Sequence, residues 1–235
     1  MAPESSDIKV DLRLDQRKKG LLWFSTYTVG FDGTYAVSNP TGRARDISVE
    51  FTLPTSDAIY DDLRFRIGGK EVPPGAATQG RLSATVALGP GQSENVQVSY
   101  RSRGLDTWTY SFGKGASQVR DFSLVMTTDF KAIDFPPRTI SPTSKEETAD
   151  GWRLAWEHES LVSGFSVGMK MPERLNPGPL AAQISLFAPV SLLFFFFVIF
   201  IMSVVKKIRL HPMHYFFLAA AFFSFHLLFA YLVDH

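Results

Sequence analysis

The sequence predicts an all-β domain followed by an α-helical transmembrane hairpin. Three observations lead to this prediction. Apolar and polar side chains alternate with period two in many short segments between residues 7 and 172, and Gly/Pro-rich turn signals separate these segments. The last quarter of the chain holds two long runs without charge. We divide the chain into a β domain (1–172), a tether (173–180), a first span (181–205), a basic loop (206–210) and a second span (211–235).

The β domain is expected to be a sandwich of the immunoglobulin-like or fibronectin-like kind. Residues 8–14 alternate apolar and polar side chains without a break, so one face of this strand is buried and the other is wet. The same pattern recurs in 47–53, 82–88, 96–100, 122–126, 152–156 and 165–169. Turns are expected at 31–33, 39–42, 68–70, 89–91 and 150–151. Many short strands without crossover helices are typical of a β-sandwich.

Four tryptophans lie on strand-like segments of this domain: Trp23, Trp108, Trp152 and Trp156. We expect them to pack in the core, because large aromatic side chains dominate the interiors of such domains. The alternative is that they form an aromatic platform for a ligand.

The two uncharged runs are long enough to cross a membrane. A helix rises 1.5 Å per residue, so about 20 apolar residues span the hydrocarbon core. Twelve of the 21 phenylalanines lie in these runs. The loop between them carries Lys206, Lys207 and Arg209 and no acidic residue, and the positive-inside rule therefore assigns the loop to the cytoplasm. The β domain is then expected on the opposite, non-cytoplasmic side.

Translocation of that domain requires a signal or a preceding span. The opening residues, Met-Ala-Pro-Glu-Ser-Ser-Asp, contain neither a basic n-region nor an apolar h-region. We therefore expect that this chain is a fragment of a longer protein; the alternative is that the domain is cytoplasmic and the positive-inside rule fails.

The composition excludes several classes of function. The 24 Lys and Arg residues nearly balance the 23 Asp and Glu residues, so there is no basic excess for binding nucleic acid. The chain has no cysteine, which excludes disulfides and thiolate chemistry. The β domain has one histidine, His158, and no Gly-x-Ser-x-Gly motif. We expect no catalysis, no cofactor and no metal; the expected partners are the lipid bilayer and further transmembrane helices or envelope proteins.

The second span carries polar residues. At 100° per residue, one helix face would hold His211, Tyr215, Leu218, Phe222, Phe225, His226 and Phe229, with His214 beside it. His211 and His214 lie near the loop, whereas His226 lies deeper. Polar groups in hydrocarbon usually face a helix bundle, so we expect His226 to hydrogen bond between helices. A proton or metal role and an interfacial placement are the alternatives.

The second span also resembles the CreD family of bacterial inner-membrane proteins. The resemblance rests on His211-Pro212-Met213-His214-Tyr215, on Phe225 and on Asp234-His235, at the family's spacing. The family has Gln, Tyr, Ser and Glu where this chain has His214, His226, Val233 and Asp234. The resemblance implies a role in cell-envelope integrity, no known enzymatic activity, and further spans before the β domain and after the hairpin.

Three hypotheses for the function follow. The first is a CreD-like, multi-pass protein of the bacterial inner membrane with a periplasmic β domain. The second is a membrane-anchored β-sandwich module that recognises an envelope ligand or a protein partner. The third is an enzyme that uses a metal held by the histidines of the spans.

Overall fold

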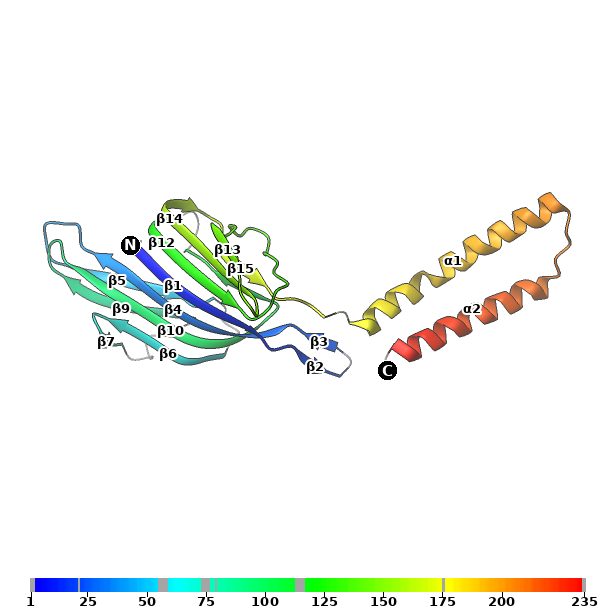
Figure 1. Ribbon diagram of the computed structural model, residues 1–235, viewed down its shortest axis with the longest axis horizontal. Coiled ribbons are helices and arrows are strands. Elements are labelled where there is room, and N and C mark those ends of the chain that lie inside the picture. The colour runs from blue at the N-terminus through cyan, green and yellow to red at the C-terminus, as the bar shows by residue number, and fades with distance from the viewer. Residues whose placement is uncertain are drawn as a thin grey trace. The chain divides into compact units, whose positions relative to one another are not determined.

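The computed structural model describes residues 3–20, 22–54, 59–72, 77–78, 80–112, 117–174 and 176–233. The chain divides into two compact units. The first comprises Met1–Arg17 and Phe24–Glu173, and the second comprises Lys18–Trp23 and Arg174–His235. The first unit is built of strands and the second contains both long helices (Figure 1).

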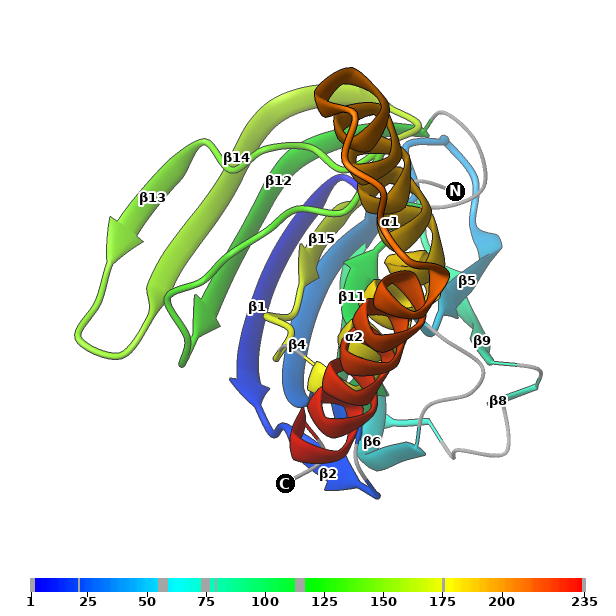
Figure 2. The ribbon, with the colours of Figure 1, turned by 90° about the vertical axis from the view of Figure 1, so that its right-hand side faces the viewer.

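One large sheet forms the body of the first unit. Its eight strands lie in the order β13-β14-β12-β1-β4-β10-β6-β7. Seen from the end in Figure 2, β14, β12, β1 and β4 follow one another across this sheet. The pair β1–β12 is parallel, and the other described pairs of this sheet are antiparallel. The strand bounds are Ser5–Leu14 (β1), Thr26–Ser38 (β4), Ile59–Ile67 (β6), Lys70–Glu71 (β7), Ser93–Leu105 (β10), Ser117–Thr128 (β12), Ser144–Glu147 (β13) and Trp152–Ser163 (β14).

Two small sheets supply the rest of the core. One has the order β5-β9-β8, with bounds Arg45–Thr52, Arg81–Leu88 and Ala77–Thr78; the other pairs β11 (Thr107–Tyr110) with β15 (Val167–Lys170). Phe31 of β4 joins the layers, because its ring lies 5.8 Å from that of Phe51 and 6.2 Å from that of Tyr110. One side of most of these strands is therefore buried against the other layer, whereas the edge strands β7 and β13 are exposed. The predicted mostly β domain followed by two apolar helices is confirmed; the immunoglobulin-like or fibronectin-like type stays a prediction.

One predicted turn is wrong. Phe31, Asp32 and Gly33 lie in the middle of β4, which runs unbroken from Thr26 to Ser38. Gly33 is needed for packing, because a Cβ there would lie 2.9 Å from the Tyr35 hydroxyl oxygen and 3.0 Å from a ring carbon of Phe31. The glycine makes room for two core aromatic rings within the strand.

The tryptophans divide between the two units. Trp108 and Trp156 are fully buried, and Trp156 Nε1 donates to the Ile140 carbonyl at 2.9 Å. Trp152 is half-buried against the same core and donates to the Lys131 carbonyl. Trp23 belongs to the second unit. Core packing is thus confirmed for the β-domain tryptophans, which leaves no exposed aromatic platform among these three.

The second unit contains a short hairpin and two helices. The hairpin pairs β2 (Arg17–Lys19) with β3 (Leu22–Phe24), and the helices are α1 (Pro177–Lys206) and α2 (Pro212–Val233). α1 begins inside the segment expected to be a tether, because proline is favoured in the first turn, where its missing N–H is not needed. α1 ends where Lys207 takes a left-handed conformation and the Ile208 N–H bonds the Ser203 carbonyl at 2.9 Å.

Candidate functional site

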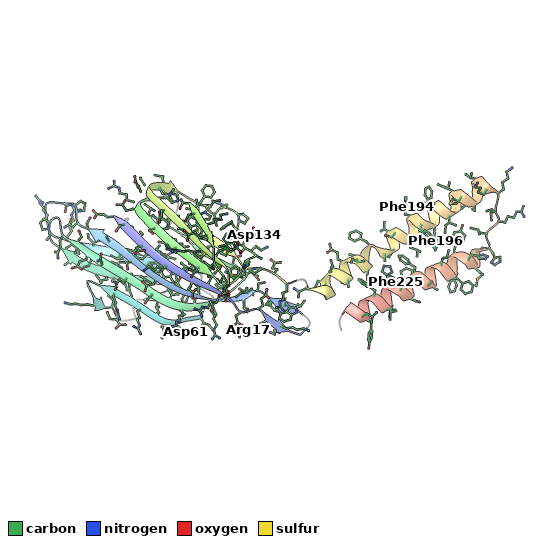
Figure 3. The ribbon with its side chains drawn as sticks, in the orientation of Figure 1. Arg17, Asp61, Asp134, Phe194, Phe196 and Phe225 are labelled. Carbon is green, nitrogen blue, oxygen red and sulfur yellow. The ribbon has the colours of Figure 1, made fainter. Side chains whose placement is uncertain are left out.

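Both helices are long and apolar enough, by length and composition, to cross a membrane. The two helices pack against each other, each along one of its faces. On α2, the half-buried residues recur at spacings of four and three, and they are Tyr215, Ala219, Phe222, His226 and Phe229. Phe196 of α1 meets Tyr215 edge to face, with ring centroids 5.3 Å apart. Figure 3 labels Phe194 and Phe196, which point to different sides of α1.

The predicted basic residues lie together between the helices. Lys206 is the last residue of α1, Lys207 caps it and Arg209 lies in the connection to α2. All three are exposed, and none forms an ion pair within the described part of the chain. Three uncompensated cations therefore mark this end of the hairpin.

The family-like motif forms the start of α2. The imidazole Nδ1 of His211 accepts the Met213 N–H at 3.2 Å, and the His211 carbonyl accepts the His214 N–H at 2.9 Å. His214 Nδ1 lies 3.0 Å from the same carbonyl. Pro212 takes the first helical position, and Tyr215 reaches α1. The motif thus caps the helix and fixes its first contact; its last residues, Asp234 and His235, lie outside the described residues.

His226 differs in part from its expected role. It lies on the face toward α1, but its Nδ1 is 3.0 Å from the carbonyl of Phe222 on its own helix. Among the described residues, the imidazole forms no hydrogen bond to α1. Its Nδ1 is already engaged by the Phe222 carbonyl, one turn earlier on α2. Phe225 and Leu218 are largely exposed, so they do not belong to the contact face where they were expected. No group of three or more His, Asp or Glu that could hold a metal occurs among the described residues.

The large sheet carries a second cluster of polar residues, on its outward face. Residues of four neighbouring strands line up there through the strand register. Lys9 pairs with Asp32, Asp32 pairs with Ser99, and Ser99 pairs with Arg64. In the next row, Asp11 pairs with Gly30 and Gly30 with Arg101. Because alternate side chains point to one face, these two rows form a continuous charged surface.

Gly30 forms the floor of a cleft in this surface. The cleft has a volume of about 700 Å³. A Cβ on Gly30 would have only the Asp11 Cβ within 4 Å, at 3.9 Å, so the space above it is open. A second cleft of about 720 Å³ shares Asp11, Gly30, Asp62 and Arg101 with the first. We call the two together the sheet cleft; its charged lining residues are Lys9, Asp11, Arg13, Asp32, Asp61, Asp62, Arg64, Arg101, Arg103 and Arg153.

A bulge shapes one wall of the sheet cleft. The register of β10 against β6 shifts between Ser99 and Arg101, and Asp62 takes a left-handed conformation with φ of 53°. A bulge of this kind re-aims a side chain. The Asp62 carboxylate lies 3.9 Å from the Arg101 guanidinium, and Asp61 is also exposed on β6 (Figure 3).

Only some of the charged side chains in the cleft form ion pairs or hydrogen bonds with one another. Asp11 accepts from Arg13 Nε at 2.9 Å and from Thr127 Oγ1 at 3.0 Å, so its carboxylate is held in place. Six other charged residues of the lining have neither an ion pair nor a side-chain hydrogen bond within the described part of the chain: Lys9, Asp32, Asp61, Arg64, Arg103 and Arg153. The cleft thus offers both signs of charge to a ligand.

Sequence reasoning missed this cleft. The alternation predicted that one face of β1, including Lys9 and Asp11, is exposed to solvent. Nothing within a single strand, however, indicates that its exposed face forms part of a cleft. The available signal was the glycine at position 30 within a strand, which often marks a close approach or an open floor. The pairing of residues from positions 9, 30, 64 and 101 depends on strand order, which the sequence did not reveal.

The comparisons with known proteins concern the fold. A crystal structure of a proposed nutrient-binding protein from Legionella pneumophila is similar, with a TM-score of 0.50 and 10% sequence identity over 72% of this chain and 68% of that chain. At this identity the similarity shows the fold alone. No protein-family model matches the sequence, and no curated protein matches it.

Proposed function

We propose that this protein is a membrane-anchored binding protein of the bacterial inner membrane, without catalytic activity. Its β domain would lie on the periplasmic side, bind a polar envelope component in the sheet cleft, and be held at the membrane by α1 and α2. The observation that supports this proposal best is the open cleft over Gly30, in a chain that also carries two apolar helices.

The lining of the cleft suggests the chemistry of the ligand. Cationic and anionic side chains alternate across it, with Lys9 beside Asp32 and Arg101 beside Asp62. A ligand with carboxylates, ammonium groups and hydroxyls would complement this pattern, because charge-assisted hydrogen bonds form with each sign. Fragments of the cell wall that contain sugar and peptide have these groups. The name of the Legionella neighbour also proposes binding, although the likeness extends only to the fold.

A variant that fills the cleft tests the binding proposal. Gly30→Leu places a side chain on the cleft floor, where a Cβ meets only the Asp11 Cβ at 3.9 Å, so we expect the fold to be retained. Gly42→Leu is the matched control, because a Cβ there has no atom within 4 Å and the glycine lies at an exposed position in a turn. The measurement is calorimetric titration of the full chain in nanodiscs with a soluble disaccharide-peptide of the cell wall.

We expect Gly30→Leu to bind this probe at least about tenfold more weakly than the wild type, because the leucine side chain occupies space that the ligand would fill. Gly42→Leu should bind like the wild type. Equal affinity of all three proteins, or no binding by the wild type, would contradict the proposal for this ligand class.

The orientation rests on the cations between the helices. Lys206, Lys207 and Arg209 are exposed at one end of the hairpin and form no ion pair with any described residue, which favours that end in the cytoplasm. A reporter that is active only in the periplasm should work when fused after Pro172 and stay silent when fused after Lys207. The reverse result would show that the β domain is cytoplasmic.

A CreD-like role in envelope integrity is the second candidate. Its support is the sequence resemblance over His211–Tyr215, a motif that caps α2 and contributes Tyr215 to the contact with α1. In such a protein the hairpin would pack with further spans. Replacing 177–233 by an unrelated membrane hairpin separates the two candidates. Retained ligand binding and retained envelope resistance to detergent support an anchored module, whereas loss of resistance with binding intact supports the CreD-like role.

A further inference from the structure

The short β2–β3 hairpin combines cationic and apolar residues. Its first strand is Arg17-Lys18-Lys19, and its second is Leu22-Trp23-Phe24. Gly20, with φ of 61°, allows the tight reversal at the end of β2. Lys18 and Lys19 are exposed, and Leu22 is 39% exposed. Such a combination of cations with leucine and tryptophan is typical of segments that bind at a membrane interface.

The hairpin is fastened to the residue that precedes α1. The Asn176 Oδ1 accepts the Trp23 N–H at 2.7 Å, and Asn176 Nδ2 donates to the Trp23 carbonyl at 3.2 Å. The side-chain amide therefore pairs with the strand as a neighbouring backbone would. The Arg174 guanidinium lies over the Trp23 ring, 4.4 Å from its centroid. Asn176 is the N-cap of α1, so these contacts hold the hairpin where the apolar helix begins.

The segments that meet here carry cations, and the adjoining Glu173 pairs with Lys170 at 2.9 Å. The segments 18–23 and 174–176 contain Lys18, Lys19 and Arg174 and no acidic residue. Arg17 already pairs with Asp15 at 2.6 Å, whereas Lys18 and Lys19 form no ion pair within the described part of the chain. Two lysines are thus free to bind anions next to the start of a membrane-spanning segment.

We propose that the β2–β3 hairpin binds the anionic phospholipid headgroups of the leaflet that the N-terminal end of α1 enters. Lys18 and Lys19 contact the phosphates, and Leu22 and Trp23 lie at the boundary of the acyl chains. The proposal is independent of the sheet cleft and its ligand. It depends on insertion of α1 into the bilayer, which sets the depth of Asn176 and therefore of Trp23.

The absence of cysteine in the sequence allows a direct measurement. The full chain carrying Leu22→Cys is spin-labelled and placed in phosphatidylcholine nanodiscs with or without phosphatidylglycerol. Collisions with oxygen, which is enriched in lipid, are compared with collisions with a water-soluble nickel chelate. The label should lie in the lipid phase when phosphatidylglycerol is present. The double change Lys18→Gln, Lys19→Gln should lower the ratio of lipid-buried to water-exposed label about 25-fold, or roughly fivefold per cation.

A matched control removes the same charge elsewhere. Arg43→Gln with Arg45→Gln changes two exposed cations of the β domain and should leave the ratio unchanged. A label that stays in water with phosphatidylglycerol, or that responds equally to both double changes, would overturn the proposal. A label that is immobilised to the same degree with and without phosphatidylglycerol would also overturn the proposal, because it would indicate that the label contacts protein.

A second measurement avoids the label at Leu22. Spin-labelled phosphatidylglycerol and phosphatidylcholine are compared as neighbours of the cysteine-free chain. The preference for phosphatidylglycerol should fall when Lys18 and Lys19 are replaced and persist when Arg43 and Arg45 are replaced. An unchanged preference in the first variant would refute the role of the hairpin.

Discussion

Replacing Gly151 by alanine should destabilise the β domain strongly, although the residue lies in one of the predicted turns. A Cβ at this position would lie 2.0 Å from the Thr128 carbonyl oxygen and 2.9 Å from the Phe130 amide nitrogen. Both are backbone atoms, so no side chain can rotate away. The turn is also tied down, because Trp152 N–H bonds Thr128 Oγ1 at 3.0 Å.

The expected loss follows from this overlap. Overpacking typically costs 1–3 kcal/mol, and a clash with backbone atoms of the neighbouring segment 128–130 belongs near the upper end, at about 3 kcal/mol. For a domain of this size about 3 kcal/mol corresponds to a fall in Tm of roughly 6–12 °C. The assay is thermal unfolding of the full chain in nanodiscs, followed by the near-ultraviolet circular dichroism of the buried aromatic residues.

Gly42→Ala is the control for this experiment. Gly42 has no atom within 4 Å of a Cβ, and its φ is not in the left-handed region. Alanine there should leave the Tm unchanged or raise the stability by up to about 1 kcal/mol, through the entropy of the unfolded chain. A Gly151→Ala protein that melts with the wild type, or a Gly42→Ala protein that falls equally, would refute the steric reasoning.

Two further predictions concern buried hydroxyl groups. Burial raises the pKa of four core tyrosines above the ordinary value near 10, that of Tyr110 to about 12; the others are Tyr27, Tyr35 and Tyr100. Because the unfolded chain loses these protons near pH 10 and the folded domain keeps them, stability is complete below that pH and falls above it, by up to about 1.4 kcal/mol per pH unit for each tyrosine. Urea unfolding at a series of pH values measures this, and a flat profile between about pH 10 and about pH 12 would contradict it. The Ser185 hydroxyl on α1 is buried without a hydrogen-bond partner among the described residues, so Ser185→Ala should leave the helix pair as stable or about 1 kcal/mol more stable in an SDS titration. A less stable pair would contradict this prediction.

The local alternation of apolar and polar side chains predicted individual strands better than it predicted how the strands and turns are arranged. The alternation in 8–14 and 82–88 corresponds to β1 and β9, because a half-buried strand must alternate whatever its neighbours are. The glycine of 31–33 misled the prediction, because a turn glycine and a packing glycine have the same letter. Gly33 lies within β4, where its lack of a side chain accommodates Tyr35.

The candidate sites show the same division. The cations at 206–209 could be identified from sequence, because a charge between two uncharged runs needs no tertiary information. The sheet cleft could not, since it joins side chains from β1, β4, β6 and β10 through a strand order that crosses the sequence. The contact between Trp23 and Asn176 was equally hidden, because 152 residues separate the two.

The sequence by itself determined that this protein has a β domain and two apolar helices joined by a basic loop. These features follow from hydropathy and side-chain periodicity, which act over a few neighbouring residues. Only the tertiary structure decided that Gly30 forms the floor of a charged cleft and that Lys18 and Lys19 lie beside the start of α1. Both depend on hydrogen bonds between distant segments, whose pairing is set by the packing of the whole unit.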